Sequence, residues 1–252
     1  MAQTLRDLGR PLASGNEADV FAYGDILLKV TKRSNDSGPA THEARILAAL
    51  APLGLAPRVD GVIEVDGHWG VLMERIHLPV MASALSDPDL FPELLELMVS
   101  LHGRIHAVTA PPEVPALKQR MATRIGRAER IAPDLRSALL TQLTGMPDGD
   151  RLCHGDFHPF NILGLDQHAR VIDWLDATRG DPAADVCRTE LLISTYDAGM
   201  AQSYAESYCL ATGVERRAVE AWLPLVAAAR LAENVPDEFD RLVQLAQGGT
   251  LG

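Results

Sequence analysis

The chain has 252 residues, enough for one large domain or two small lobes, and 47% of them are hydrophobic, which is ample for a packed core. The formal net charge of −11 argues against a nucleic-acid-binding protein, because such proteins need lysine and arginine to neutralise phosphates. Three cysteines without a Cys-x-x-Cys pair argue against a disulfide framework or a zinc site. No apolar run has the length of a signal core or a membrane span, so we expect a soluble, cytoplasmic protein.

The first third of the chain has the pattern of a small antiparallel sheet with one helix. Strand-like runs occur in pairs, and Gly24-Asp25 joins the first pair as a two-residue hairpin signal. Apolar residues at helical spacing then predict a helix whose inner face carries Ile46, Leu47 and Leu50. The expected elements are strands at residues 18–23 and 26–30, a helix at 41–50, and strands at 59–65 and 69–73.

After Pro79 the pattern becomes helical. The apolar residues between Leu90 and Val108 recur at helical spacing and predict one long amphipathic helix. Further helices are expected at residues 115–131, 134–143 and through most of 183–246, with a loop and hairpin at 152–173. We therefore predict an α+β, two-lobed fold: residues 1–76 form a small antiparallel-sheet lobe with one helix, and residues 77–252 form a larger, mainly helical lobe.

Two acids and an amide stand at spacings that one hairpin can bring into a single site. Asp156 and Asn161 are five residues apart, and Asp173 follows Asp156 by seventeen residues at the end of an apolar run. A loop carboxylate can accept the proton of an attacking hydroxyl, and carboxylate and amide oxygens are hard ligands suited to Mg²⁺. Each residue alone is typical of a turn or a strand end, but the three together predict a phosphoryl-transfer site for a magnesium nucleotide.

Lys29 is a lone cation in the apolar strand expected at residues 26–30. Burying an unpaired ammonium is costly, so this lysine needs phosphate oxygens or a carboxylate beside it. Glu43, which we expect in the first turn of the following helix, can supply that carboxylate. The alternative interpretation is an ordinary edge-strand lysine with a surface glutamate.

These segments resemble the aminoglycoside phosphotransferase and choline kinase superfamily, the small-molecule relatives of eukaryotic-like protein kinases. The matching pieces, in order and spacing, are His154-Gly155-Asp156 with Asn161, then Ile172-Asp173-Trp174, then Gly180-Asp181-Pro182-Ala183-Ala184-Asp185. The run Leu101–His106 resembles the end of the first long helix of the C-terminal lobe in these kinases. The resemblance implies a protein-kinase-like fold, ATP as the phosphoryl donor with GTP as an alternative, and Mg²⁺.

The resemblance also implies a role for each matching residue of the catalytic segment. Asp156 would be the catalytic base, and Asn161 and Asp173 would hold magnesium. His154 would brace the catalytic loop by hydrogen bonding, and Asp185 would tie the backbone of that loop.

On the nucleotide side, the resemblance implies that Lys29 grips phosphate and that Glu43 orients Lys29. Residues 14–20 stand where relatives have a phosphate-covering turn, so Ser14 is expected near the phosphates. Residues 73–76 fall at the hinge between the lobes, where backbone groups of relatives bind adenine. This implies that Glu74 and Ile76 contact the base of the nucleotide.

Other residues near these motifs have competing interpretations. Asp181 is predicted to cap a helix that has Pro182 in its first position. His102 and His106 are four apart, a spacing that also suits zinc, but no third ligand is apparent and a structural role explains both. His158 and Asp176 have no role that their chemistry assigns.

Two other function classes compete with the kinase prediction. A metallophosphoesterase shares the partial pattern of Asp66-Gly67-His68 with Gly155–His158, but its third sequence block is missing here. A catalytically inactive, pseudokinase-like nucleotide-binding module is the alternative within the fold, although Lys29, Asp156 and the metal candidates are all present.

The acceptor is the least determined part of the prediction. From residue 184 onward the chain has ten acidic residues and five arginines, and an acidic lobe favours a cationic partner. We therefore predict transfer of the γ-phosphoryl group to a hydroxyl of an aminoglycoside or a related amino-alcohol or sugar metabolite. The oligomeric state and the choice between ATP and GTP stay open.

Overall fold

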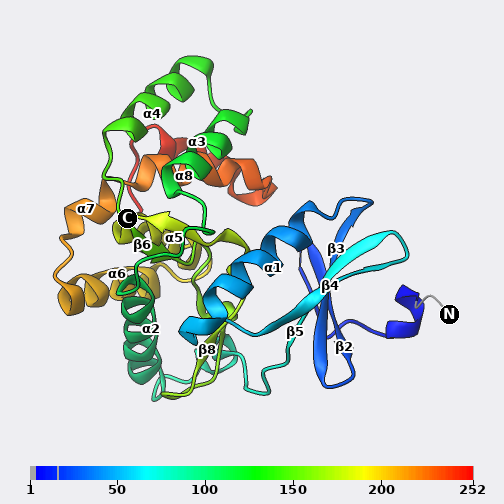
Figure 1. Ribbon diagram of the computed structural model, residues 1–252. Helices are drawn as coiled ribbons and strands as arrows, with labels where there is room; N and C mark the ends of the chain where they lie inside the picture. The colour runs from blue at the N-terminus through cyan, green and yellow to red at the C-terminus, as the bar shows by residue number, and fades with distance from the viewer. Residues whose placement is uncertain (1–3, 16, 252) are drawn as a thin grey trace.

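The structure is a computed structural model that describes residues 4–15 and 17–251 (Figure 1). It confirms the predicted α+β, two-lobed architecture, with a small sheet lobe at one end and a mainly helical remainder. Among the residues described, no helix combines the length and apolarity needed to cross a membrane.

The N-terminal lobe is built on a five-stranded antiparallel sheet in the order β1-β2-β3-β5-β4. Two of the predicted strands have the expected ends, whereas β3 runs four residues further. Strand β1 was not predicted, because two residues at a sheet edge carry no readable alternation. The strands are β1 (Ala13–Ser14), β2 (Ala18–Tyr23), β3 (Ile26–Ser34), β4 (Val59–Val65) and β5 (His68–Glu74).

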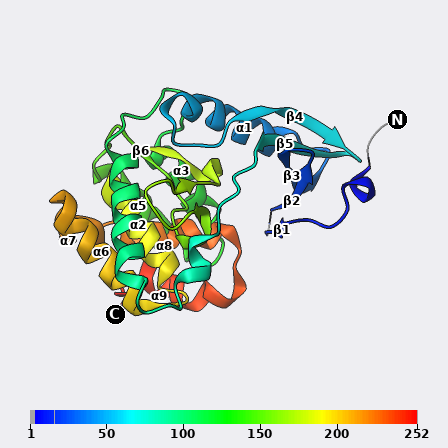
Figure 2. The same ribbon diagram turned by 90° about the horizontal axis from the view of Figure 1, so that it is seen from below.

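Helix α1 (Gly38–Leu50) covers one face of this sheet (Figures 1 and 2). It begins three residues before the predicted start, because Pro39 is preorganised for the first helical turn. Glu43 therefore lies in the second turn and not in the first, where the sequence placed it. The side chain of Glu43 is buried together with Ile46, Leu47 and Leu50.

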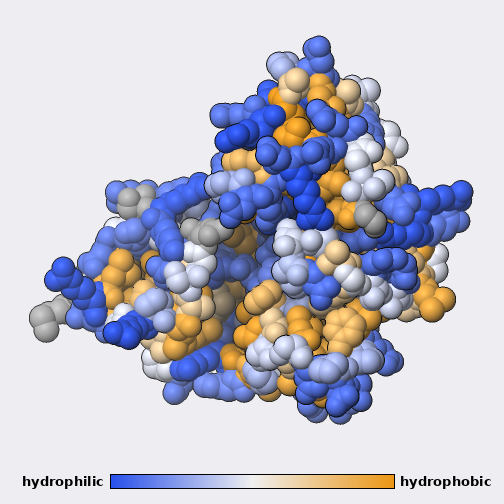
Figure 3. All heavy atoms as spheres, turned by 180° about the vertical axis from the view of Figure 1, so that it is seen from behind, coloured by the Kyte–Doolittle hydropathy of each residue, from blue (hydrophilic) through white to orange (hydrophobic). Residues whose placement is uncertain are grey.

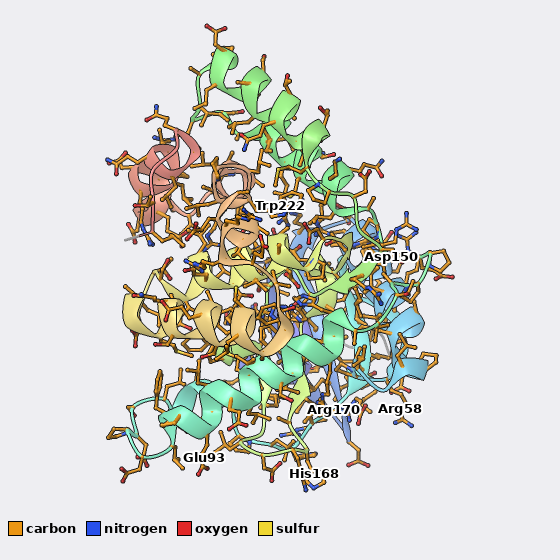
Figure 4. The ribbon with its side chains drawn as sticks, turned by 90° about the vertical axis from the view of Figure 1, so that its left-hand side faces the viewer. Arg58, Glu93, Asp150, His168, Arg170 and Trp222 are labelled. Atoms are coloured by element: carbon orange, nitrogen blue, oxygen red, sulfur yellow. The ribbon has the colours of Figure 1, made fainter. Side chains whose placement is uncertain are left out.

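The helical part packs around α5 (Pro182–Ile193), in which Ala183 to Ile193 are all buried. Its side chains are covered by the neighbouring helices, and Trp222 lies inside this part of the molecule (Figure 4). The other helices are α2 (Phe91–His106), α3 (Leu117–Arg127), α4 (Pro133–Gly145), α6 (Ala198–Thr212), α7 (Arg216–Glu220), α8 (Leu223–Arg230) and α9 (Phe239–Ala246).

Two short antiparallel pairs of strands lie between α4 and α5. Strand β6 (Arg151–Cys153) pairs with β9 (Thr178–Gly180), and β7 (Ile162–Leu163) pairs with β8 (Arg170–Val171). Asp181 then caps α5 by accepting a hydrogen bond from Ala183 N at 3.0 Å, which confirms the predicted cap.

One hydrophobic core joins the two lobes. Ile46, Leu47 and Val71 of the N-terminal lobe belong to the same buried cluster as Met98 and Leu101 of α2. A second, smaller cluster around Leu28 fills the opposite face of the sheet. Burying one such aliphatic side chain stabilises the fold by about 2 kcal/mol. The lobes thus form one packed body, and we retain the division after residue 76 as a proposal for the hinge, since the connection between β5 and the next element lies there.

Candidate functional site

Lys29 lies at the centre of a three-residue contact that joins the two lobes. Its Nζ is 2.8 Å from Glu43 Oε1 on α1 and 2.8 Å from Asp173 Oδ1, which follows β8. Strand β3, which carries Lys29, is an inner strand of the sheet. Lys29 lies there between Val20 of β2 and Val71 of β5. The structure therefore brings together three residues that are up to 144 positions apart in the chain.

The two carboxylates determine the charge state of this lysine. Burial acts to lower the pKa of Lys29, but Glu43 and Asp173 more than offset burial and raise that pKa above its ordinary value. Burial also raises the pKa of Glu43, against the opposing effect of Lys29. At neutral pH the lysine is therefore a fixed positive charge between these two carboxylates.

Asp156 and Asn161 face each other across the catalytic loop. Asn161 Nδ2 donates to the Asp156 carbonyl at 2.9 Å and to Asp156 Oδ2 at 3.1 Å. The backbone carbonyl of Asn161 accepts a hydrogen bond from Ile172 N at 2.9 Å, which ties this loop to the segment that carries Asp173. This amide orientation leaves Asn161 Oδ1 without a hydrogen-bond partner among the described residues, so it can serve as a ligand oxygen.

Two residues of this region have left-handed backbone conformations. Asp173 has φ 61° and ψ 65°, which an aspartate tolerates better than most residues. Gly155 has φ 80°, and a Cβ at this position would collide with the Asp176 carbonyl. The close approach of these two loops, which sets the position of Asp156, therefore requires glycine at residue 155.

Asp185 binds the backbone of the loop that carries Asp156. Its carboxylate accepts hydrogen bonds from His154 N at 2.6 Å and Gly155 N at 2.8 Å. The same carboxylate accepts from the Nε2 atoms of His102 at 3.0 Å and His106 at 3.1 Å. Burial acts to raise the pKa of Asp185, but these histidines and their hydrogen bonds hold it well below its ordinary value.

The two α2 histidines are oriented by two tyrosines of α6. Tyr204 Oη is 2.5 Å from His102 Nδ1, and Tyr208 Oη is 2.7 Å from His106 Nδ1. Each tyrosine hydroxyl donates to Nδ1, so each Nε2–H is left to donate to Asp185. Asp185 is the third side chain that the zinc interpretation lacked. Because every ring nitrogen has a hydrogen-bond partner, the geometry supports the structural role.

His154 completes the bracing of the loop. Its Nε2 donates to the Ile172 carbonyl at 3.0 Å, and its Nδ1 accepts from Asp156 N at 3.1 Å. Burial lowers the pKa of His154, so the ring is neutral and both contacts use one consistent tautomer. His154 thereby connects the segments that carry Asp156 and Asp173.

Arg188 is a residue of the site that the sequence analysis did not identify. This buried α5 side chain donates from Nε to the Gly155 carbonyl, and its Nη2 is 3.4 Å from Asp156 Oδ1. His158 Nε2 lies 3.4 Å from Asp156 Oδ2. Burial acts to raise the pKa of Asp156, but His158 and Arg188 outweigh burial and hold that pKa well below its ordinary value. Asp156 is therefore an ionised carboxylate at neutral pH.

Asp176 lies at the centre of an arginine cluster. Arg124 Nη2 contacts both of its carboxylate oxygens at 2.8 and 2.7 Å, and Arg120 donates to Asp176 Oδ1. Arg188 Nη2 approaches Asp176 Oδ2 at 3.5 Å. Burial acts to raise the pKa of Asp176, but the three arginines lower it below its ordinary value. Sequence chemistry assigned no role to Asp176, and the structure makes it the counter-ion of these arginines.

Ser14 lies at the end of β1 and is engaged with neighbouring polar groups. Its hydroxyl donates to Asp19 Oδ1 at 2.5 Å and accepts from Lys32 Nζ at 3.2 Å. Lys32 Nζ also donates to the Gly15 carbonyl at 2.5 Å. These contacts shape the turn after β1, and phosphate binding by Ser14 stays a prediction.

Glu74 ends β5 with its side chain turned toward the helical lobe. Glu74 Oε2 accepts from Arg58 N at 3.0 Å and lies 3.7 Å from Arg170 Nη2. Arg58 and Arg170 accordingly appear on the same side of the molecule (Figure 4). Ile76 is half-buried in the connection that follows. The Glu74 carboxylate is thus already occupied, and a nucleotide contact at either residue, which stays a prediction, would use backbone groups.

The residues described above come from both lobes, and the molecular surface is hollowed between these lobes (Figure 3). Lys29 and Glu43 belong to the N-terminal lobe, whereas Asp156, Asn161 and Asp173 belong to the helical lobe. The arrangement combines a fixed cation, two ligand oxygens and an ionised carboxylate, which are the groups that phosphoryl transfer requires.

The chain is similar to one protein family over most of its length. The model of the family described as "Phosphotransferase enzyme family" matches residues 9–225. No curated protein matches the chain.

Solved structures share the fold over almost the whole chain. A thermostable mutant of aminoglycoside phosphotransferase APH(4)-Ia has a TM-score of 0.68 at 18% identity, covering 95% of this chain and 91% of that one. A choline/ethanolamine kinase family protein from Mesorhizobium loti has a TM-score of 0.64 at 18% identity, covering 95% and 87%. Choline kinase from Cryptosporidium parvum has a TM-score of 0.60 at 14% identity, covering 94% and 88%. These similarities confirm the predicted kinase-like fold and, with the family match, the predicted superfamily.

Replacing Asp185 by asparagine tests the support of the catalytic loop. Three of the four N–H donors bind Asp185 Oδ2 and one binds Oδ1, so an NH₂ group in place of either oxygen leaves at least one donor without its acceptor. We expect Asp185→Asn to lower the free energy of unfolding by about 3 kcal/mol, measured by urea denaturation. Asp150→Asn is the matched control, because Asp150 lies at the surface (Figure 4) and its side chain is 65% exposed. Equal stabilities of the two variants would contradict the role of Asp185.

His102 gives the fold a specific dependence on acid. Burial, with help from the neighbouring His106, lowers the pKa of His102 from 6.5 to about 3. Between these values the unfolded chain binds a proton that folded His102 does not, so stability is present above pH 6.5 and falls as the pH decreases. For this one group the slope is about 1.4 kcal/mol per pH unit.

We expect His102→Gln to flatten the dependence of the unfolding free energy on pH by about one proton, since glutamine still donates to Asp185 and does not titrate. His168→Gln, a change at an exposed histidine in the turn after β7 (Figure 4), should leave the slope as it is in the wild type. A slope for His102→Gln that equals the wild-type slope would show that His102 does not control acid stability.

Proposed function

Because this chain belongs to the phosphotransferase enzyme family, we propose that it transfers the γ-phosphoryl group of a magnesium nucleotide to a hydroxyl of a small molecule. The observation that carries the proposal is the contact of Lys29 with both Glu43 and Asp173, each at 2.8 Å, beside the paired Asp156 and Asn161. An ordinary surface lysine would not be buried between carboxylates from two lobes.

In this proposal Lys29 binds phosphate oxygens of the nucleotide, and Glu43 keeps its Nζ in place. The buried side chain of Glu43 has few rotamers open to it, so it fixes the lysine better than an exposed carboxylate would. Backbone groups near Glu74 and Ile76 would meet the base of the nucleotide, and the turn at Ser14 would cover the phosphates.

Asn161 and Asp173 are the proposed holders of Mg²⁺. The donor set suits this ion, because Asn161 Oδ1 has no hydrogen-bond partner among the described residues and the Asp173 carboxylate keeps Oδ2 beyond its contact with Lys29. When bound, the ion neutralises the charge that develops on the phosphate oxygens. His154 holds the two metal-binding segments in register through its contacts with Ile172 and Asp156.

Asp156 is the proposed base. As the acceptor hydroxyl oxygen forms its bond to the γ-phosphorus, the bond from that phosphorus to the β-phosphate oxygen breaks and the hydroxyl proton passes to an Asp156 carboxylate oxygen. Asn161 and Arg188 hold the side chain of Asp156 for this step, and its 29% exposure leaves room for an acceptor.

The donor and acceptor are proposed from relatives and from the site. APH(4)-Ia forms ternary complexes with AMP-PNP or ADP and hygromycin B, which supports ATP as the donor here, with GTP as the alternative. Aminoglycosides and amino alcohols are the acceptor types that the names of the two groups of relatives suggest, and we include sugar metabolites in the proposal. An inactive nucleotide-binding module stays the competing proposal, and it predicts nucleotide binding without transfer.

Acceptor-dependent ADP release by the wild type separates these two proposals, and replacing Asp156 by asparagine then tests the base. Asparagine keeps the shape of the side chain but cannot accept the hydroxyl proton, so we expect transfer, measured as acceptor-dependent ADP release, to fall by at least about 100-fold. Nucleotide affinity should stay within a few-fold of the wild-type value. Asp166→Asn, in the exposed turn after β7, is the control and should retain full turnover. Unchanged turnover in Asp156→Asn would rule out this base.

Replacing Asp173 by alanine tests the proposed Mg²⁺ site. Wild type should gain thermal stability with ATP and Mg²⁺ together, and less with ATP and EDTA, because only ligands that bind the folded state raise the melting temperature. Asp173→Ala should lose the magnesium-dependent part of this shift, whereas Asp166→Ala should keep it. If wild type shows no shift with ATP or GTP, the nucleotide proposal fails.

A further inference from the structure

A cluster of arginines borders the proposed base on the side of α3 and α5. Arg120 and Arg124 are four residues apart on α3 and therefore project from one face of that helix. Together with Arg188 they surround Asp176, and Arg188 also contacts Asp156. Three guanidinium groups thus meet at Asp176, next to the position where an acceptor hydroxyl would approach the base.

The arginines of this cluster share their carboxylate partners. Arg120, Arg124 and Arg188 all contact Asp176, and Arg124 and Arg188 also contact Glu233 at 3.1 and 2.9 Å. Arg230 contacts the same Glu233 at 2.7 Å, besides its bidentate partner Glu238. Because each of these two carboxylates serves three arginines, an anionic group on the acceptor would give the arginines a further partner.

A small pocket lies against the same arginines. It has a volume of about 40 Å³, and its wall includes Arg120, Arg124, Arg188 and Thr178. The Thr178 hydroxyl has no hydrogen-bond partner among the described residues, although its side chain is only 2% exposed. Buried hydroxyls are normally hydrogen-bonded, so this one indicates a polar ligand atom. The pocket has space for one small polar group and not for a sugar ring.

The acidic residues of the helical lobe are largely engaged elsewhere. Glu190 and Glu220 pair with Arg216, and Glu215 pairs with Arg217. Asp185 is buried beneath the catalytic loop, and Glu238 is paired with Arg230. Glu233 faces the cluster beside Asp156, but it is paired with Arg124, Arg188 and Arg230, so it does not offer a free carboxylate to a cationic acceptor.

We propose that the acceptor carries an anionic group, a carboxylate or a phosphate, which binds Arg120 and Arg124 while its hydroxyl faces Asp156. Arginine suits both anions because its planar fork gives two parallel N–H donors. The acceptors that fit are sugar acids, hydroxy acids and phosphorylated alcohols. This inference rests on the proposed phosphoryl transfer and narrows its substrate class.

The test uses acceptors that differ in the charge of one substituent at one carbon. One series is glucuronate, glucose and 6-amino-6-deoxyglucose, and a second is glycerate, glycerol and 3-aminopropane-1,2-diol. Glycerol 3-phosphate distinguishes a phosphate from a carboxylate, and hygromycin B represents large polycations. With full-length protein, MgATP and a coupled assay of ADP release, we expect kcat/KM of the anionic members to exceed that of their neutral and cationic partners at least about 10-fold.

Variants on one helix then connect that preference to the arginines. Arg120→Gln leaves Asp176 with two arginine partners and removes one charge-assisted contact, so KM for the best anionic acceptor should rise about 10- to 100-fold. Its KM for MgATP should stay near the wild-type value. Arg124→Lys keeps the charge and should lose less than Arg120→Gln. Arg127→Gln, at an exposed position of α3, is the matched control and should behave as wild type.

Each result supports or overturns the inference. Preference for cationic or neutral members, or an unchanged acceptor KM in Arg120→Gln, would mean that the arginines only position Asp156. No transfer to any anionic acceptor, with a normal MgATP-dependent thermal shift, would also overturn the inference while leaving nucleotide binding intact. Absence of that thermal shift would instead remove the proposed function on which the inference rests.

Discussion

The carboxylate of Asp185 is the interaction on which the rest of the helical lobe depends. It is buried, and burying an isolated charge costs several kcal/mol. Four N–H donors offset this cost, two from the catalytic loop and two from α2 histidines. Tyr204 and Tyr208 then fix the tautomer of each histidine. One charge therefore sets the positions of α2, α5, α6 and the loop that carries Asp156 relative to one another.

Lys29 has the corresponding function between the lobes. The sheet and α1 share a hydrophobic core with the helices, and this core excludes water but has little directional preference. The contacts of Lys29 with Glu43 and Asp173 fix the orientation of the two lobes relative to each other. A charge-assisted hydrogen bond weakens when its geometry is lost, so it favours one orientation. Lys29 between the lobes and Asp185 under the loop that carries Asp156 are thus both buried charges held by several charge-assisted hydrogen bonds.

The sequence predicted those parts of the fold and site that depend on local order. Short strand-like runs marked the ends of β2 and β4, and the spacing of Asp156, Asn161 and Asp173 indicated a single hairpin. Other parts depend on contacts that no local pattern contains. The α2 histidines meet tyrosines 102 residues away, and four-residue spacing in both helices was the only available signal. Arg188 could have been noticed as a charged residue inside an apolar helix, but not its partners.

Charge shows most clearly why composition does not determine recognition. The chain has a net charge of −11, and a ligand far from the surface would sense that average. A ligand bound in the site experiences mainly the electric field of the nearest charged groups, because solvent and ions screen charges that are more than about 10 Å away. Next to Asp156 those groups are Arg120, Arg124 and Arg188, which share Asp176 and Glu233. An acidic protein can therefore carry a local cluster of arginines, and the pairing of charges in that cluster, not the total charge, sets the field next to Asp156.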